Sequence, residues 1–279
     1  MNDQSITPVP LMAHLVAGYP DMDASLSAAE GLIEGGAAYL EIQIPFSDPS
    51  ADGPTIRDAC AAALARGFSV YDSLLLIKEL RRLYPSVPVF VMAYASLVVT
   101  PGVGPFVDTL AAEGVRGLIV PDLPFDADEG LAAACASLGP LGPAVVPVAA
   151  PSMRRDRLLA MAQLGRPYVY AALRTGITGD STDVDQTAAD FLELCARGGS
   201  KVLGGFGIRT GAQARLVAPR LHAVVAGSVF VEAIRSAVSA HGTSRRGAYQ
   251  GSLRVRNQAI RQAVRSVAEE ITGRRGFIR

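Results

Sequence analysis

Two acidic side chains lie close together in an apolar part of the sequence, within the segment YLEIQIPFSDPSADGP, residues 39–54. Glu41 interrupts a run of strand-forming residues, and Asp52 lies in the proline-containing loop that follows. A carboxylate inside such a run is costly unless it is paired, protonated or used in a reaction. The simpler alternative is an edge strand on which Glu41 faces water. Because apolar residues flank Glu41 and a second acid follows at once, the pattern predicts a site of two carboxylates on one βα unit.

The sequence lacks a strand-end lysine and clustered metal ligands, and this excludes some types of reaction. A Schiff-base aldolase needs a lysine near the carboxyl end of a strand, but Lys78 falls in a helical pattern and Lys201 opens a strand. The three histidines are scattered, and no residues have zinc-ligand spacing. We therefore expect no metal and no cofactor. Proton transfer by Glu41 and Asp52 remains, with Tyr170 as a third candidate.

Three glycine-containing loops lie late in the chain: GITGDST (residues 176–182), GGFGI (204–208) and AGSVF (226–230). Each is a weak signal alone, since glycines also end strands. Together they fall where barrel enzymes bind phosphate with backbone N–H groups and a helix N-terminus. Gly207, Gly227 and Ser228 are the predicted phosphate-binding residues.

Short β-branched runs alternate with Ala/Leu-rich helical patterns along the whole chain. Strands without hairpin signals, each followed by a helix, predict parallel strands with helical crossovers. The expected strands are Leu11–Val16, Tyr39–Ile44, Val87–Ala93, Gly117–Val120, Ala144–Val148, Tyr168–Leu173, Lys201–Leu203 and Ala223–Ala226. The expected helices are Asp23–Gly35, Thr55–Leu83 with a break near Gly67, Phe106–Glu113, Asp126–Leu138, Arg154–Leu164, Val184–Ala196 and Thr210–Val217.

Eight such units favour an α/β fold of the closed (β/α)₈ TIM-barrel type over an open doubly wound sheet. The absence of GxGxxG after a strand weakens a dinucleotide-binding interpretation. No linker divides the chain, so we expect one TIM-barrel domain over residues 1–279, with a C-terminal helix at about 254–272 and a basic tail at 273–279. In such a barrel the loops at the carboxyl ends of the strands carry the chemistry.

Composition excludes several classes of protein. The 279 residues are 49% hydrophobic and 19% charged, with a formal net charge of +0, so no global field favours nucleic acid. The three cysteines are odd in number and far apart, as expected of buried thiols in a reducing compartment. The start of the chain has no secretory pattern, and no apolar run approaches the ~20 residues of a membrane span. We expect a cytoplasmic protein that binds neither nucleic acid nor membranes.

The segment LEIQIPFSDPSADGPTI resembles the signature of the tryptophan synthase α subunit family. AGYP (17–20), DLP (122–124), GITG (176–179), GFGI (205–208) and AGS (226–228) follow in that family's order and spacing, so the resemblance covers nearly the whole chain. It implies a (β/α)₈ barrel of tryptophan biosynthesis that cleaves indole-3-glycerol phosphate to indole and glyceraldehyde 3-phosphate, a retro-aldol carbon–carbon lyase. It also implies a pyridoxal-phosphate β subunit as partner in an α₂β₂ complex, which receives indole through a tunnel.

The resemblance also implies roles for individual residues. Glu41 matches the catalytic acid/base that protonates the indole C3 and handles the glycerol hydroxyl proton. Asp52 matches the carboxylate that accepts the indole N–H. Loops 45–56 and 174–183 match the pair that closes over substrate. The expected substrate-binding residues are His14, Gln43, Tyr170, Gly179, Phe206, Gly207, Gly227 and Ser228.

Four positions depart from the family pattern. Gln43 replaces a glycine and, two residues from Glu41, faces the same side of the strand. His14 replaces an aromatic residue of the indole pocket, Leu173 a serine, and Ser96 an asparagine near the β-subunit contact. Family drift with unchanged activity is one explanation. The alternatives are a stand-alone lyase or altered-substrate paralogue that needs no β subunit, and a catalytically weak allosteric partner of a β-type enzyme, against which both retained acids argue.

Overall fold

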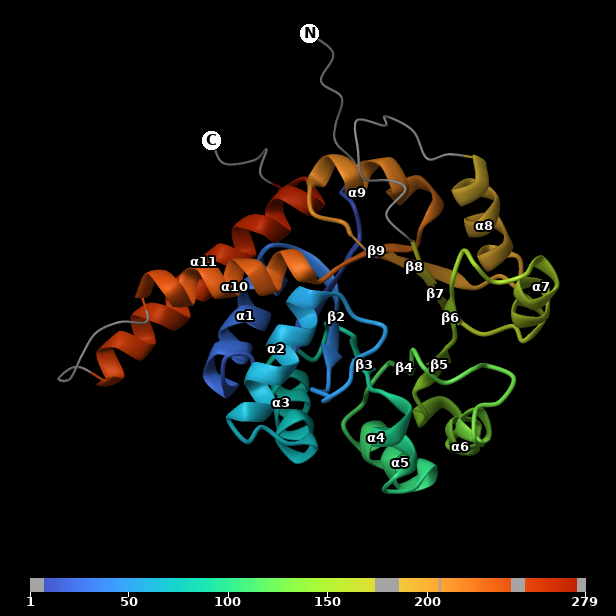
Figure 1. Ribbon diagram of the computed structural model, residues 1–279, viewed down its shortest axis with the longest axis horizontal. Helices are drawn as coiled ribbons and strands as arrows, with labels where there is room; N and C mark the ends of the chain where they lie inside the picture. The colour runs from blue at the N-terminus through green and yellow to red at the C-terminus, as the bar shows by residue number, and fades with distance from the viewer. Residues whose placement is uncertain (1–7, 174–185, 206, 242–248, 275–279) are drawn as a thin grey trace, which may run out of the picture.

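The strands form one parallel sheet that curves into a barrel surrounded by helices, as Figure 1 shows. The computed structural model describes residues 8–173, 186–205, 207–241 and 249–274. Neighbouring strands pair in the order β5-β4-β3-β2-β1-β9-β8-β7-β6. The strands are β1 (Leu11–Val16), β2 (Ala37–Gln43), β3 (Val89–Met92), β4 (Gly117–Ile119), β5 (Ala144–Val146), β6 (Val148–Ala149), β7 (Tyr168–Ala172), β8 (Lys201–Gly205) and β9 (Ala223–Ala226). The predicted single-domain TIM barrel is confirmed.

The fifth strand position of the barrel is divided in two. Pro147 separates β5, which pairs with β4, from β6, which pairs with β7. Proline has no N–H to give to a ladder, although its carbonyl still accepts from the Tyr170 backbone N–H at 2.9 Å. The strand expected over Ala144–Val148 is therefore two short segments, and nine strands occupy eight positions.

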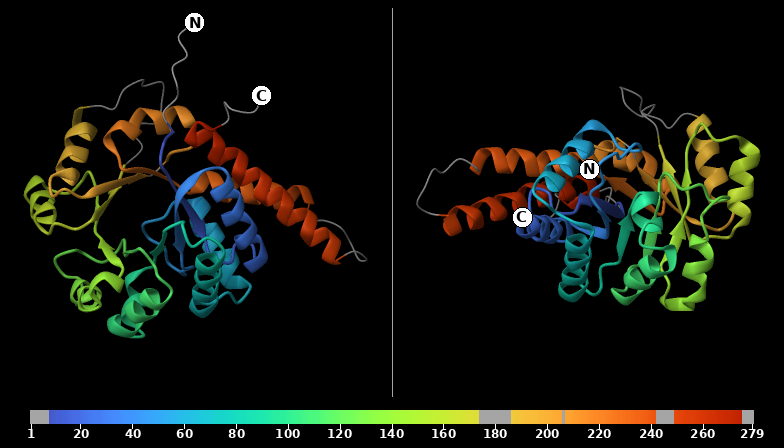
Figure 2. Two further views of the ribbon diagram at one scale, coloured as in Figure 1. Left: turned by 180° about the vertical axis from the view of Figure 1, so that it is seen from behind. Right: turned by 60° about the horizontal axis from the view of Figure 1, so that its bottom comes forward.

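The helices cover the outside of the sheet (Figures 1 and 2). They are α1 (Met22–Glu34), α2 (Pro54–Ala65), α3 (Val70–Leu83), α4 (Ala95–Val99), α5 (Val103–Ala112), α6 (Leu131–Ser137), α7 (Arg155–Gln163), α8 (Gln186–Ala196), α9 (Gly211–Val217), α10 (Ser228–His241) and α11 (Tyr249–Thr272). Among them, no single helix has the length and apolar composition of a membrane span. Only α2 and α3 taken together meet that test, and they are bent by 106°.

Several helix boundaries differ from those expected. α4 lies in a segment expected to be loop, and α10 was not expected at all. α6 begins only at Leu131 because Glu129 and Gly130 adopt positive φ angles of 51° and 81°, which are incompatible with the helix expected from Asp126. α11 ends at Thr272 as predicted but begins at Tyr249.

The alternation of side chains along β2 decides what faces the barrel interior. Leu40 and Ile42 belong to the apolar layer between strands and helices, whereas Tyr39 packs against the separate cluster inside the barrel. Glu41 and Gln43 share the inward face of Tyr39 because successive strand side chains alternate. The amino end of the interior is filled by aromatic packing, in which the ring of Phe90 contacts those of Tyr39 and Tyr168 edge to face. This packing leaves the carboxyl end as the place where the interior can hold a cavity.

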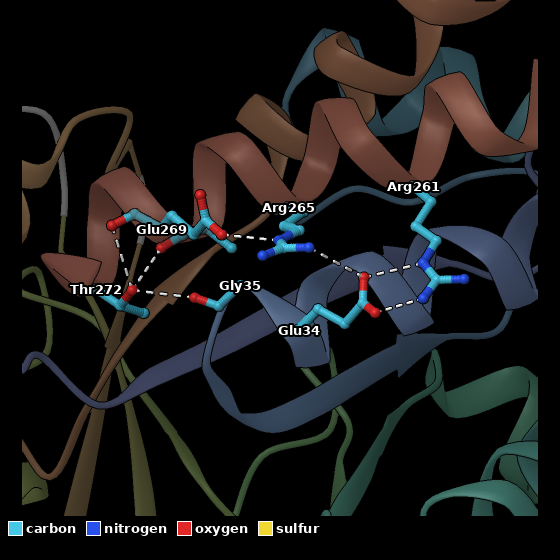
Figure 3. Close-up of polar contacts among 7 residues, drawn as sticks. Glu34, Gly35, Arg261, Arg265, Glu269 and Thr272 are labelled. Atoms are coloured by element: carbon cyan, nitrogen blue, oxygen red, sulfur yellow. Dashed lines mark hydrogen bonds and ion pairs between the residues drawn. The ribbon is translucent and has the colours of Figure 1, made fainter. Parts of the chain in front are cut away.

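The C-terminal helix α11 lies along α1 and α10 (Figure 1). The Thr272 hydroxyl donates to the backbone carbonyl of Gly35 at 3.1 Å, and Arg261 pairs with Glu34, as Figure 3 shows. The Val9 backbone N–H donates to the Thr272 carbonyl at 3.2 Å, which joins the end of α11 to the residues that precede β1. α1 and α11 approach closely at Gly31, where an added Cβ would lie 2.2 Å from the Arg261 carbonyl oxygen.

We expect the substitution Gly31→Ala to destabilise the protein. The added methyl would meet the backbone of α11, so the two helices would have to separate, and overpacking of this kind costs about 1–3 kcal/mol. The free energy of unfolding, measured by urea denaturation, should fall by that amount.

Gly104→Ala is the matched control, because Gly104 also lies in a helix and an added Cβ there would meet nothing within 4 Å. Its free energy of unfolding should stay unchanged or rise by up to about 1 kcal/mol from the better helix propensity of alanine. Equal stability of the two variants would contradict the close helix contact.

Candidate active site

A cavity of about 590 Å³ opens at the carboxyl end of the barrel strands. Strand residues and the loop after β2 form its wall together, as expected for a barrel enzyme. Its lining residues are His14, Ala51, Asp52, Gly53, Pro54, Thr55, Ile56, Met92, Ile119, Pro121, Val148, Ala150, Tyr170, Ala172, Gly207, Arg209, Val225, Gly227 and Ser228. A larger groove of about 890 Å³ runs along α1 and α11 and contains the Glu34–Arg261 ion pair, but it shares no lining residue with this cavity.

Glu41 is completely buried, with 0% of its surface exposed, which excludes the edge-strand alternative. Neither carboxylate oxygen has a hydrogen-bond partner, but Oε1 lies 3.4 Å from Nδ1 of His14. The strand register places these two residues side by side on β1 and β2. Glu41 and Gln43 are not among the lining residues, whereas His14 is. Glu41 therefore lies behind the cavity wall.

The charge of Glu41 acts on His14. Burial lowers the pKa of the His14 imidazole, but the attraction of the Glu41 carboxylate beside Nδ1 raises that pKa. Asp52 and Gln43 add smaller effects in the same direction, and the net result is a pKa above the ordinary value of 6.5. The carboxylate thus favours the protonated form of His14.

Asp52 is held at the cavity by two donors on the same carboxylate oxygen. Gln43 Nε2 donates to Oδ2 at 2.7 Å, and the Tyr94 hydroxyl donates to Oδ2 at 2.8 Å. The same hydroxyl accepts from the backbone N–H of Ala51 at 3.0 Å. Burial, together with the Asp52 charge, raises the pKa of Tyr94, so its hydroxyl stays protonated as a donor. Burial also raises the pKa of the nearby Cys60 thiol, to about 11.

The other predicted site residues fall into two groups. Tyr170, Gly207, Gly227 and Ser228 line the cavity at the carboxyl end of the barrel, and their roles in binding remain a prediction. Burial, and then the charges of Glu41 and Asp52, raise the pKa of Tyr170 well above its ordinary value. Two further predicted residues, Gly179 and Phe206, lie outside the described residues.

A second set of cavity residues was not selected from the sequence. Arg209 lines the cavity beside Gly207 and forms an ion pair with Glu232 of α10, in which Nη1 lies 3.1 Å from Oε1. The Thr55 hydroxyl, at the start of α2, donates to the same Oε1 at 3.4 Å. The signal was the position of Arg209, directly after GFGI in a loop already assigned to the working face. Ser228 begins α10, whose first N–H groups lie at this side of the cavity.

The chemistry open to this site is proton transfer and anion binding. Among the described residues, no three His, Cys, Asp or Glu side chains gather in a metal-binding group. A buried carboxylate behind an imidazole, a second carboxylate at the wall and a cationic glycine-containing rim converge on one cavity. These features define a (β/α)₈ barrel enzyme with its active site at the carboxyl ends of the strands.

Comparison with known proteins narrows the class to a family. The family model for the tryptophan synthase alpha chain matches residues 4–261. The tryptophan synthase alpha chain of Helicobacter hepaticus is 35% identical over 230 residues, covering 80% of this chain and 85% of that protein. That of Synechococcus elongatus is 34% identical over 227 residues, covering 81% and 84%. The chain therefore belongs to the tryptophan synthase alpha chain family, which places it among the lyases.

Solved structures agree. A structure of the tryptophan synthase α₂β₂ complex from Pyrococcus furiosus has a chain that is 28% identical with a TM-score of 0.79, covering 96% of this chain and 100% of that chain. A chain of the Mycobacterium tuberculosis tryptophan synthase in an open form is 32% identical with a TM-score of 0.73, covering 93% and 94%.

Tyr94→Phe should destabilise the loop that carries Asp52. The ring remains, but the partly buried Ala51 N–H loses its acceptor and Asp52 loses a donor, at a cost of about 1–3 kcal/mol. Urea denaturation should show this loss. Tyr71→Phe is the control, because the Tyr71 side chain is 68% exposed, and it should change stability by no more than about 0.5 kcal/mol. A Tyr94→Phe variant as stable as the control would show that the hydroxyl does not hold this loop.

Proposed function

We propose that this protein cleaves indole-3-glycerol phosphate to indole and glyceraldehyde 3-phosphate as a tryptophan synthase alpha chain. The observation that carries the proposal is the position of the family's signature acids at one cavity: Asp52 lines it, and Glu41 lies behind His14 of its wall, with Arg209 and Gly227 among the other lining residues. The reaction breaks a carbon–carbon bond by a retro-aldol route, which requires a proton at the indole C3 and removal of the proton from the glycerol hydroxyl.

In the proposed reaction the two acids have separate tasks. Glu41 supplies the charge that governs proton exchange with the substrate, because it is buried and its carboxylate has no competing hydrogen bond. Asp52 accepts the indole N–H. Gln43 and Tyr94 both occupy its Oδ2, so Oδ1 remains for the substrate. Ring charge that develops on protonation of C3 is then stabilised by a fixed carboxylate.

The phosphate of the substrate is proposed to bind at the opposite side of the cavity. Gly207 and Gly227 leave room for an anion at the start of α10, where Ser228 and the first-turn N–H groups are donors. Arg209 adds a permanent positive charge there. Glu232 holds that guanidinium in the absence of substrate and competes with the phosphate for it.

The proposed partner is a tryptophan synthase β subunit in an α₂β₂ assembly. Support comes from the Pyrococcus furiosus complex, whose two kinds of subunit are described as activating each other. Ser96 lies exposed on α4, directly after the carboxyl end of β3 and at the rim of the barrel that holds the cavity. The cytoplasmic location remains a prediction.

The first test is indole release from indole-3-glycerol phosphate by the purified protein. Glu41→Gln should lower kcat by about 10²–10⁴-fold, the usual contribution of a general acid or base. Glu79→Gln, on the surface helix α3, is the matched control and should retain full activity. An active Glu41→Gln variant would contradict the role of this carboxylate.

The same assay with added β subunit tests the partner. Indole release should rise when the β subunit is present and should be unaffected by an equal amount of an unrelated protein. If the isolated chain releases indole but the β subunit changes nothing, the lyase proposal stands and the partner proposal fails.

Arg209→Ala and Glu232→Gln should change the affinity for substrate in opposite directions. Loss of the guanidinium should raise KM about tenfold with little change in kcat, since a bound phosphate loses one charge-assisted contact worth roughly 1.5 kcal/mol. In Glu232→Gln, Arg209 loses its acidic partner, so KM should fall and inhibition by inorganic phosphate should become stronger. Arg220→Gln, an exposed arginine outside the cavity, is the control. Unchanged KM in both variants would remove Arg209 from the site.

A further inference from the structure

His14 separates the buried acid from the cavity. Glu41 is fully buried and absent from the cavity wall, whereas His14, only 6% exposed, is part of that wall. Nδ1 of His14 lies toward Glu41 at 3.4 Å, and Nε2, on the other side of the ring, has no hydrogen-bond partner. A buried imidazole nitrogen without a partner is costly, so a group that binds at the cavity is its natural acceptor or donor.

The ring has space because residue 227 is glycine. A Cβ at this position would lie 3.0 Å from Cδ2 of His14 and 3.2 Å from its Cγ, closer than ordinary van der Waals contact. Gly227 also lines the cavity. The His14 ring is therefore fitted between Glu41 on one side and the glycine of the proposed phosphate rim on the other.

We infer that His14 is the residue that exchanges the proton with substrate in this protein, and that Glu41 acts through it as a positioning residue. The inference rests on the proposed lyase function and specifies which atom performs the chemistry. A carboxylate behind an imidazole fixes the orientation and tautomer of the ring and stabilises its protonated form. The acid of the family signature then does not need to reach the substrate.

One imidazole can both donate the proton and take one back in this reaction. Protonated His14 gives its Nε2 proton to the indole C3, and the C2–C3 π electrons form the new C–H bond. Neutral His14 then takes the proton from the hydroxyl on the adjacent glycerol carbon, and the O–H electron pair becomes the carbonyl π bond. The carbon–carbon bond breaks, its electron pair restores the indole ring, and His14 ends protonated as it began. No oxidant or further reactant is required.

Charges from each neighbouring element act on His14. Glu41 acts on it from β2 and Asp52 from the loop after β2, while Tyr170 of β7 lines the same cavity and has its own pKa raised by burial and by these two carboxylates. Arg209 is the cation of the same cavity, but it is paired with Glu232. The two carboxylates raise the pKa of His14 against the effect of burial, so the protonated form is present below that raised pKa and is lost as pH rises through it.

The activity test compares His14→Asn with Glu41→Gln. His14→Asn should lower kcat by about 10²–10⁴-fold with KM within a fewfold of wild type, because asparagine preserves polarity but carries no proton. In wild type, kcat should fall above a pKa higher than 6.5. In Glu41→Gln that fall should move to lower pH by about one unit or more, since the opposite charge that favours the imidazolium is removed. His241→Asn, on the surface end of α10, is the control.

A titration without substrate separates this inference from the lyase proposal. The chain has three histidines, so the NMR titration of each imidazole can be assigned by substitution. One signal should titrate above 6.5, disappear in His14→Asn and shift to lower pH in Glu41→Gln. If no indole is released but this titration is found, the lyase proposal fails, whereas the effect of Glu41 on the His14 pKa is supported. The inference is overturned if wild type releases indole and His14→Asn retains most of that activity. It is also overturned if the His14 pKa is the same in Glu41→Gln as in wild type.

Discussion

The burial of one carboxylate is the constraint on which this site depends. A parallel strand alternates its side chains, so the apolar face of β2 that packs on the helices forces Glu41 into the barrel interior. Removal of a carboxylate from water costs several kcal/mol unless a partner offsets it. The strand register brings only one ionisable side chain beside it on β1, His14. Glu41 therefore has an imidazole 3.4 Å away, and the Glu41 carboxylate raises the pKa of that imidazole.

The two acids of the site differ because their neighbours differ. Asp52 lies at the wall of the cavity and accepts from Gln43 and Tyr94, so its orientation is fixed by donors. Glu41 has no donor other than the His14 ring nearby. One carboxylate is thus suited to hold a stationary negative charge and the other to accompany a moving proton. Both residues belong to the same βα unit, so their difference comes from local contacts and not from their place in the fold.

The sequence predicted the elements that follow from periodicity and missed the contacts that follow from register. Alternation along a strand was sufficient to place Gln43 on the face of Glu41, and the glycine loops indicated the rim at Gly227 and Ser228. That His14 neighbours Glu41 depends on how β1 slides against β2 when the barrel closes, which no local pattern encodes. Arg209 was overlooked because a single charge in a loop has no periodicity. The division of the fifth strand at Pro147 likewise depends on pairing with two different neighbours.

The C-terminal helix also has a connection to the site. α11 ends where its Thr272 carbonyl accepts from the backbone N–H of Val9, two residues before β1 begins. α1, on which α11 lies through the close contact at Gly31, joins β1 to β2 in the chain. Helix packing outside the barrel thus fixes the start of β1, which carries His14. It also fixes α1, which connects β1 to β2, the strand that carries Glu41. Because a distance of 3.4 Å between an imidazole and a carboxylate is sensitive to small strand shifts, the precision of the buried pair depends on a helix interface far from the cavity.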